Sequence, residues 1–289
     1  MNYEVVTDSS ADLTDDMIEK YSIHILSLVY RIGGEEFHSY VKGQKTDHKR
    51  FYDRLRKGEL AETSLISVEQ CQHTFESILK QGKDLLYIGV SSALSGSYNA
   101  AAMVASHLRE AYPDRRVYTV DSLSASLGEG LLVYYAAEQR LAGKSIDEVN
   151  AWLLANRLHL CHWFTVDDLF HLKRGGRISA TTALLGTMLS VKPVMHVDDE
   201  GRLVPVGKVR GRRRSLEALA DEMQKTCINP TEQVVFISHG DSIEDAQYVE
   251  KLVRERLGVK DTLINYVDPV IGAHSGPGTI ALFFLGARR

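Results

Sequence analysis

The sequence predicts an α/β protein with two domains: an N-terminal domain built on a Rossmann-like parallel sheet and a smaller C-terminal domain of mixed α/β structure. Short apolar segments alternate with helical segments through the first half, which is typical of a parallel sheet with crossover helices. The second half opens with a hairpin signal at residues 198–201. The 289 residues exceed a typical single domain, and we place the boundary between residues 1–159 and 160–289.

The N-terminal elements are expected from apolar periodicity and from residues that start or stop helices. Ser67 and Gln70 resemble a capping box for a helix over residues 68–80, so Thr63 and Ser64 are not needed for capping. Strands are expected at residues 3–6, 23–30, 35–38 as a hairpin arm, 84–90 and 116–120, and helices at 13–21, 51–57, 68–80, 98–109, 125–142 and 145–158.

The C-terminal elements are expected in the same way, with a turn at residues 198–201 between the arms of the hairpin. Three closely spaced glycines indicate turns over residues 271–279. Strands are expected at residues 159–166, 191–197, 203–209, 233–238, 262–267 and 280–285, and helices at 167–172, 178–189, 215–227 and 243–257.

A serine-rich turn joins the expected strand at residues 84–90 to the helix at 98–109. It contains Ser91, Ser92, Ser95 and Ser97. Ligands of open α/β sheets bind beyond the carboxyl ends of the strands, and a helix N-terminus offers unpaired N–H groups and the positive end of a dipole. We therefore favour a small anion site for one carboxylate or phosphate. The alternative is an ordinary helix cap.

Composition narrows the class of protein. A hydrophobic content of 44% and a charged content of 25% are ordinary for a globular chain, and a net charge of −4 gives no general attraction to nucleic acid. The cysteines Cys71, Cys161 and Cys227 are far apart, without metal-binding spacing, so no metal site is expected. The N-terminus lacks the pattern of a signal peptide. We expect a cytoplasmic protein.

The known catalytic motifs match poorly. The nucleophile elbow G-x-S-x-G would have to include Ser91, but Ala93 occupies its last position. Neither a phosphate-binding glycine loop nor a metal-binding H-E-x-x-H motif occurs. This pattern favours a binding protein over an enzyme. Two alternatives stay open: a serine hydrolase that uses Ser95 or Ser91, and a DNA-binding regulator that uses the basic residues 210–214.

Several short motifs are spread nearly end to end along the chain. They are TDSSADL at 7–13, ETS at 62–64, SSALSGSY at 91–98, DS at 121–122, LKRGGRI at 172–178, KP at 192–193 and HSGPG at 274–278. In sequence and order they resemble the motifs of DegV-family fatty-acid-binding proteins, and the resemblance covers residues 3–287. It implies two α/β domains with one long-chain fatty acid, such as palmitate, buried between them.

The resemblance also implies roles for individual residues. Thr63 and Ser95 are expected to hold the carboxylate, and His274 to approach it, with a purely structural histidine as the alternative. The full set of expected ligand-binding residues is Thr63, Ser95, Ser64, Ser92, Gly96 and His274. In the better-understood bacterial members, a separate fatty acid kinase phosphorylates the bound carboxylate. The resemblance therefore implies a lipid-binding protein without a cofactor, which presents its ligand to a kinase and is not itself an enzyme.

Further expectations concern the surroundings of the ligand. Arg174 and Arg177 are expected to dock a partner, or else to lie in a solvated loop. The apolar residues 178–189 are expected to form a helix that lines the acyl tail, or else packs in the core. Burying a tail contributes about 0.8 kcal/mol per methylene, so the tail dominates affinity and the hydroxyls place the head group. A brief contact with a membrane surface would serve ligand exchange.

Overall fold

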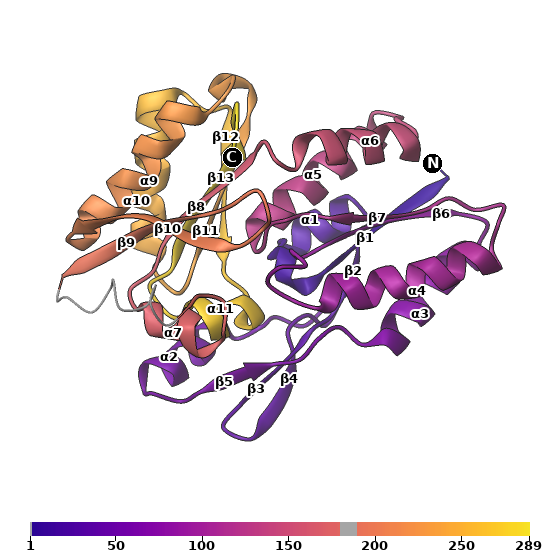
Figure 1. Cartoon of the computed structure of the whole chain (residues 1–289), viewed down its shortest axis with the longest axis horizontal. Coiled ribbons are helices and arrows are strands. Elements are labelled where there is room, and N and C mark those ends of the chain that lie inside the picture. The colour runs from indigo at the N-terminus through magenta and orange to yellow at the C-terminus, as the bar shows by residue number, and fades with distance from the viewer. Residues whose placement is uncertain (1, 180–189) are drawn as a thin grey trace.

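The computed structural model describes residues 2–179 and 190–289, and its N-terminal half contains a parallel sheet (Figure 1). The sheet has four strands in the order β2-β1-β6-β7, and all three pairings are parallel. This confirms the Rossmann-like arrangement that the sequence predicts. The strands are β1 (Tyr3–Asp8), β2 (His24–Leu26), β6 (Asp84–Gly89) and β7 (Val117–Asp121).

The second half of the chain forms a mixed sheet of six strands in the order β10-β9-β8-β13-β11-β12. Only the β11–β12 pairing is parallel among its described strands. The mixed α/β character is therefore confirmed, although this shorter half carries the wider sheet. The strands are β8 (Leu160–Thr165), β9 (Val191–Val197), β10 (Leu203–Arg210), β11 (Val234–His239), β12 (Asp261–Tyr266) and β13 (Ile280–Leu285).

A third, antiparallel sheet corrects one prediction. The strand expected over residues 23–30 is two strands, β2 and β3 (Val29–Ile32), that belong to different sheets. The chain bends between them because Leu28 N–H donates to Ser9 Oγ and Ser27 Oγ accepts from Tyr40 N–H, at 2.9 and 3.1 Å. The other two strands of this sheet are β4 (Glu35–His38), the expected hairpin arm, and β5 (Ala61–Thr63), which was not expected.

Most helices lie where the sequence places them, because their caps are local. Thr14, Ser67 and Ser145 each accept a backbone N–H at a helix start. Of the helix expected at residues 178–189, residues 180–189 lie outside the described residues. The helices are α1 (Asp15–Lys20), α2 (His48–Arg56), α3 (Val68–Lys80), α4 (Ser97–Ala111), α5 (Leu127–Leu141), α6 (Ile146–Asn156), α7 (Leu169–Arg174), α9 (Arg212–Thr226), α10 (Ile243–Leu257) and α11 (Pro269–Ser275). Two 3₁₀ turns are Ser9–Ala11 and Pro230–Glu232.

Helix α11 corrects a second prediction, because residues 271–279 were expected to form turns. Asp268 caps the helix by accepting from Val270 N–H, and Pro269 occupies the first turn. Gly276 ends it with φ +79°. The cap and the proline, which lie just before the glycine-rich stretch, make the segment helical.

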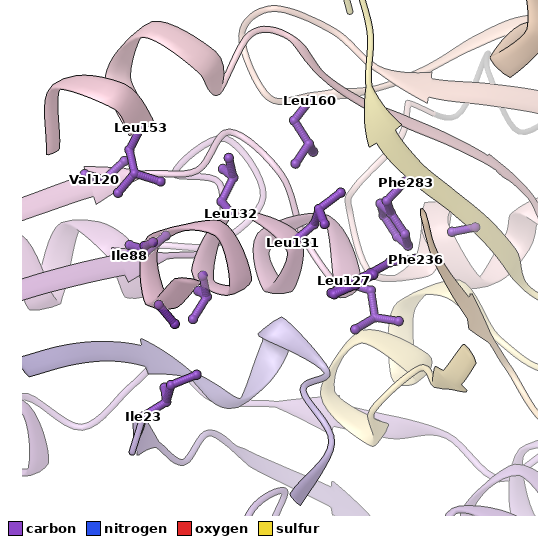
Figure 2. Packing of buried hydrophobic residues seen from close by; sticks show 14 of the residues in the cluster. Ile23, Ile88, Val120, Leu127, Leu131, Leu132, Leu153, Leu160, Phe236 and Phe283 are labelled. Atoms are coloured by element: carbon purple, nitrogen blue, oxygen red, sulfur yellow. The ribbon is translucent and has the colours of Figure 1, made fainter. Parts of the chain in front are cut away.

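Helix α5 joins the two halves through one hydrophobic core (Figure 2). Figure 2 shows Leu127 and Leu131 of α5 near Phe236 and Phe283 of the C-terminal sheet. The same core contains Ile88 of the N-terminal sheet. A division at residue 159 stays a prediction, since all strands of the parallel sheet precede it but α5 packs against both sheets. The site described next lies at this junction.

Candidate functional site

A cavity of about 920 Å³, including the part open to solvent, lies between the two large sheets. Its walls combine apolar side chains, such as Phe164, Leu172 and Val270, with a comparable number of polar ones. This composition is typical of pockets for small organic ligands. The polar residues that line it are Ser10, Thr63, Ser64, Ser95, Ser126, His162, Arg177, Ser238, His274, Ser275 and Thr279.

Thr63 and His274 meet at one part of the wall. Thr63 Oγ1 lies 2.9 Å from His274 Nε2, although the residues are 211 positions apart. Thr63 ends β5, and His274 lies in the last turn of α11. Burial, and then the charge of Arg177, lower the pKa of His274 to about 4, so the imidazole is neutral at pH 7. Residue 175 has room against this ring only as a glycine, because an added Cβ would lie 2.2 Å from His274 Nδ1.

Ser95 is the serine of the 91–97 turn that reaches the cavity wall. Its Oγ lies 3.0 Å from Ser97 Oγ and accepts from Ser97 N–H at 3.2 Å, at the start of α4. The buried neighbours have structural partners: Ser91 Oγ donates to the Gly201 carbonyl at 2.9 Å, and Ser97 Oγ accepts from Ile66 N–H at 3.1 Å. Much of the serine-rich pattern therefore holds the turn together.

Arg177 also lines the cavity, whereas Arg174 lies exposed at the end of α7. Arg177 Nε donates to the Leu94 carbonyl at 3.0 Å, and its Nη1 donates to the Gly175 carbonyl. Burial lowers the pKa of Arg177, but a guanidinium keeps its proton in proteins. Arg177 therefore gives the wall of the cavity a positive charge.

The structure brings together four of the six residues expected to bind the ligand: Thr63, Ser64, Ser95 and His274. Ser92 and Gly96 do not line the cavity, and a contact of either residue with a ligand stays a prediction. Ser92 N–H donates to Asp121 Oδ1 at 3.2 Å, which ties its backbone to the end of β7. At Gly96, an added Cβ would lie 3.4 Å from the Leu65 side chain, which stands beside it.

Sequence reasoning missed several polar residues of the walls. Ser10 Oγ donates to Glu129 at 3.1 Å, and Ser126 Oγ lies 3.0 Å from Ser238 Oγ, so these hydroxyls belong to a buried polar network. Burial raises the pKa of Glu129. His162 was also missed, although it interrupts an otherwise apolar run at the start of β8. A polar residue in a fully buried strand was the available signal.

The geometry gives little support to the two alternative functions. The hydroxyls of Ser91 and Ser95 bond to a carbonyl and to another serine, with no histidine partner among the described residues. In the basic run, Arg212 Nε donates to Asp245 at 2.8 Å and Arg214 Nη1 to Glu217 at 3.0 Å. These ion pairs neutralise positive charge that binding to a nucleic-acid backbone would require.

Residues 2–179 and 190–289 contain neither a membrane-spanning helix nor a cluster of metal ligands. No helix there is both long enough and apolar enough to cross a bilayer. Within the same residues, no group of three His, Cys, Asp or Glu side chains is arranged to hold a metal ion.

Comparison with known proteins places these features in a family. The model described as "Uncharacterised protein, DegV family" matches residues 2–287. A DegV domain-containing protein of Clostridium perfringens is 45% identical over 284 residues, which covers 98% of this chain and 97% of that protein.

Solved structures are similar over the full length. A fatty-acid-binding DegV-family protein from Thermus thermophilus superposes with a TM-score of 0.88 at 27% identity, covering 99% of this chain and 100% of that chain. A stearic-acid-binding protein from Eubacterium ventriosum superposes with a TM-score of 0.86 at 26% identity, covering 98% of each chain.

Proposed function

This chain belongs to the DegV family, and we propose that it binds one long-chain fatty acid, such as palmitate, in the cavity between its sheets. The observation that supports this most directly is the combination within one cavity of apolar walls with Thr63, Ser95, His274 and Arg177. Similar proteins from Thermus thermophilus and Eubacterium ventriosum bind fatty acids. A fatty acid has the matching chemistry, with one anionic end and a long apolar tail.

In this proposal Thr63 and Ser95 hold the carboxylate. Each neutral hydroxyl contributes about 1 kcal/mol net, while a sixteen-carbon tail contributes on the order of 10 kcal/mol gross at ~0.8 kcal/mol per methylene. Arg177 supplies the opposite charge on the same cavity wall. Neutral His274 orients the Thr63 hydroxyl without adding a second charge.

The position of the head group suits delivery to a separate enzyme. Ser64 and Leu65, which follow Thr63, are exposed, Leu65 at 57%, whereas the walls from β8 and β11 are buried. A carboxylate at Thr63 would thus lie near the surface with its tail inside. We infer that a fatty acid kinase phosphorylates it there, with the exposed Arg174 as a docking contact, and that this chain is a binding protein.

Extraction of the purified protein followed by mass spectrometry tests the ligand class. The expected result is a long-chain fatty acid in stoichiometric amount, which delipidated protein takes up again on titration. Protein that stays empty, and takes up no fatty acid when it is offered, would overturn the proposal. Fluorophosphonate labelling that is lost in Ser95→Ala would instead support the hydrolase.

A further inference from the structure

His162 is a polar side chain in the wall that β8 contributes to the cavity. It is 5% exposed. Its Nδ1 lies 3.2 Å from Ser124 Oγ, and its Nε2 has no hydrogen-bond partner in the described part of the chain. Its ring centroid lies 5.3 Å from that of Phe164 and 4.5 Å from that of Phe283. One nitrogen is thus unpaired in an aromatic wall.

The imidazole is neutral, because burial lowers the pKa of His162 to about 3. A neutral imidazole has one donor and one acceptor nitrogen. If Ser124 donates to Nδ1, then Nε2 carries the proton and donates; if Nδ1 donates to Ser124, then Nε2 accepts. A ligand that covers this nitrogen and cuts it off from water without offering a partner is disfavoured in either case.

Further hydroxyls lie on neighbouring elements of this wall. Ser126, at the start of α5, donates to Asp12, and Ser238 of β11 lies 3.0 Å from Ser126 Oγ. Both line the cavity, and both come from other elements than Thr63, Ser95 and His274. A purely hydrocarbon tail leaves His162 Nε2 unpaired, whereas a hydroxyl on the tail can either donate to it or accept from it.

We propose that the cavity takes an acyl chain that carries a hydroxyl group, a hydroxy fatty acid, with His162 Nε2 as the specificity-determining partner of that hydroxyl. This rests on the proposed function and deepens it. Discrimination is achievable at such a site, because a pocket built around a hydrogen-bonding group disfavours the analogue that leaves that group unpaired.

Competition binding to delipidated protein tests this, with stearic acid against a series of hydroxystearic acids whose hydroxyl moves along the chain. We expect at least one isomer to bind tighter than stearic acid by about 5-fold, as one net hydrogen bond allows. In His162→Phe this preference should disappear. In His162→Gln, which keeps a polar group near the position of Nε2, it should be largely retained.

His196→Phe is the matched control, because His196 stacks on Trp163 and does not line the cavity. It should leave the preference unchanged. Equal preference in the wild type and His162→Phe, or an equal loss in His196→Phe, would overturn the inference. If His162→Phe fails to fold, the wild type alone still tests the inference. Wild-type protein that binds no hydroxystearic acid isomer tighter than stearic acid would overturn it. Binding of stearic acid without any hydroxyl preference defeats only this inference, whereas no binding of any acid defeats the proposed function.

Discussion

At the scale of single residues, the part of the cavity around Thr63, where we propose that the head group binds, combines the positive charge of Arg177 with the neutral imidazole of His274. Arg177 is held by the carbonyls of Leu94 and Gly175. His274 has a pKa of about 4, so it pairs with Thr63 as a neutral group. A carboxylate placed here would form one charge-assisted interaction, with Arg177, and weaker hydrogen bonds to neutral groups. It would therefore be positioned but bound less strongly than by several charged groups.

Substitution of the two hydroxyls tests their role. Thr63→Ala and Ser95→Ala should each weaken fatty acid binding about 5-fold, the equivalent of about 1 kcal/mol, while phosphorylation of the bound ligand by a matching kinase falls further, because the carboxylate is no longer held in place. Titration calorimetry and a kinase assay measure the two effects. Ser92→Ala is the control, and a loss as large as that of Ser95→Ala would contradict the assignment.

The buried His239 gives a pH prediction. It is 2% exposed and accepts from Ser242 N–H at 3.1 Å, and burial lowers its pKa to about 4. The unfolded histidine titrates near pH 6.5, so the unfolded state binds more protons between these values. The stability that the neutral ring contributes is fully present above about pH 6.5 and is lost as pH falls toward 4.

Chemical denaturation at two pH values measures this. From pH 7 to 5, wild type should lose about 2 kcal/mol more unfolding free energy than His239→Gln. The comparison with a variant is needed because Asp12, whose pKa burial raises to about 8, acts in the opposite direction in both proteins. Equal losses would show that His239 is not held neutral.

At the scale of elements, α5 approaches its neighbours closely at a glycine. An added Cβ at Gly130 would lie 2.4 Å from the Ala11 carbonyl oxygen, a backbone atom. Gly130→Ala should therefore lower the unfolding free energy by roughly 1–3 kcal/mol, despite the better helix propensity of alanine. Urea denaturation measures this. Gly207→Ala, in β10, has nothing within 4 Å of its added Cβ and should change stability little; an equal effect would contradict the packing argument.

At the scale of the whole molecule, one core spans both large sheets, so both halves should unfold together. The two tryptophans report on them separately: Trp152 lies on α6 and Trp163 on β8. In denaturant unfolding, the tryptophan that remains in Trp152→Phe and the one that remains in Trp163→Phe should report the same m-value. In each variant, the fluorescence midpoint should coincide with the midpoint of the far-UV circular dichroism transition. A separate transition for either half would indicate two independent folding units.

Much of the fold was accessible from the sequence, because its signals are local. The caps Thr14, Ser67 and Ser145 start helices where predicted, and the alternation of apolar strands with helices indicates a parallel sheet. Prediction failed at Ser27 and Leu28, where the chain bends to reach Ser9 and Tyr40. Those partners are distant in sequence, and no local pattern identifies them.

The sequence by itself determined the fold class, most element positions and the serine, threonine and histidine motifs that resemble the family. Only the tertiary structure decided which of these side chains face one cavity. Of the serines in the 91–97 turn, Ser95 lines it, Thr63 lies beside His274, and Arg177 and His162 also line the walls. The physical reason is that periodicity and capping depend on neighbours within a few residues. A cavity wall instead depends on which buried faces from distant segments meet.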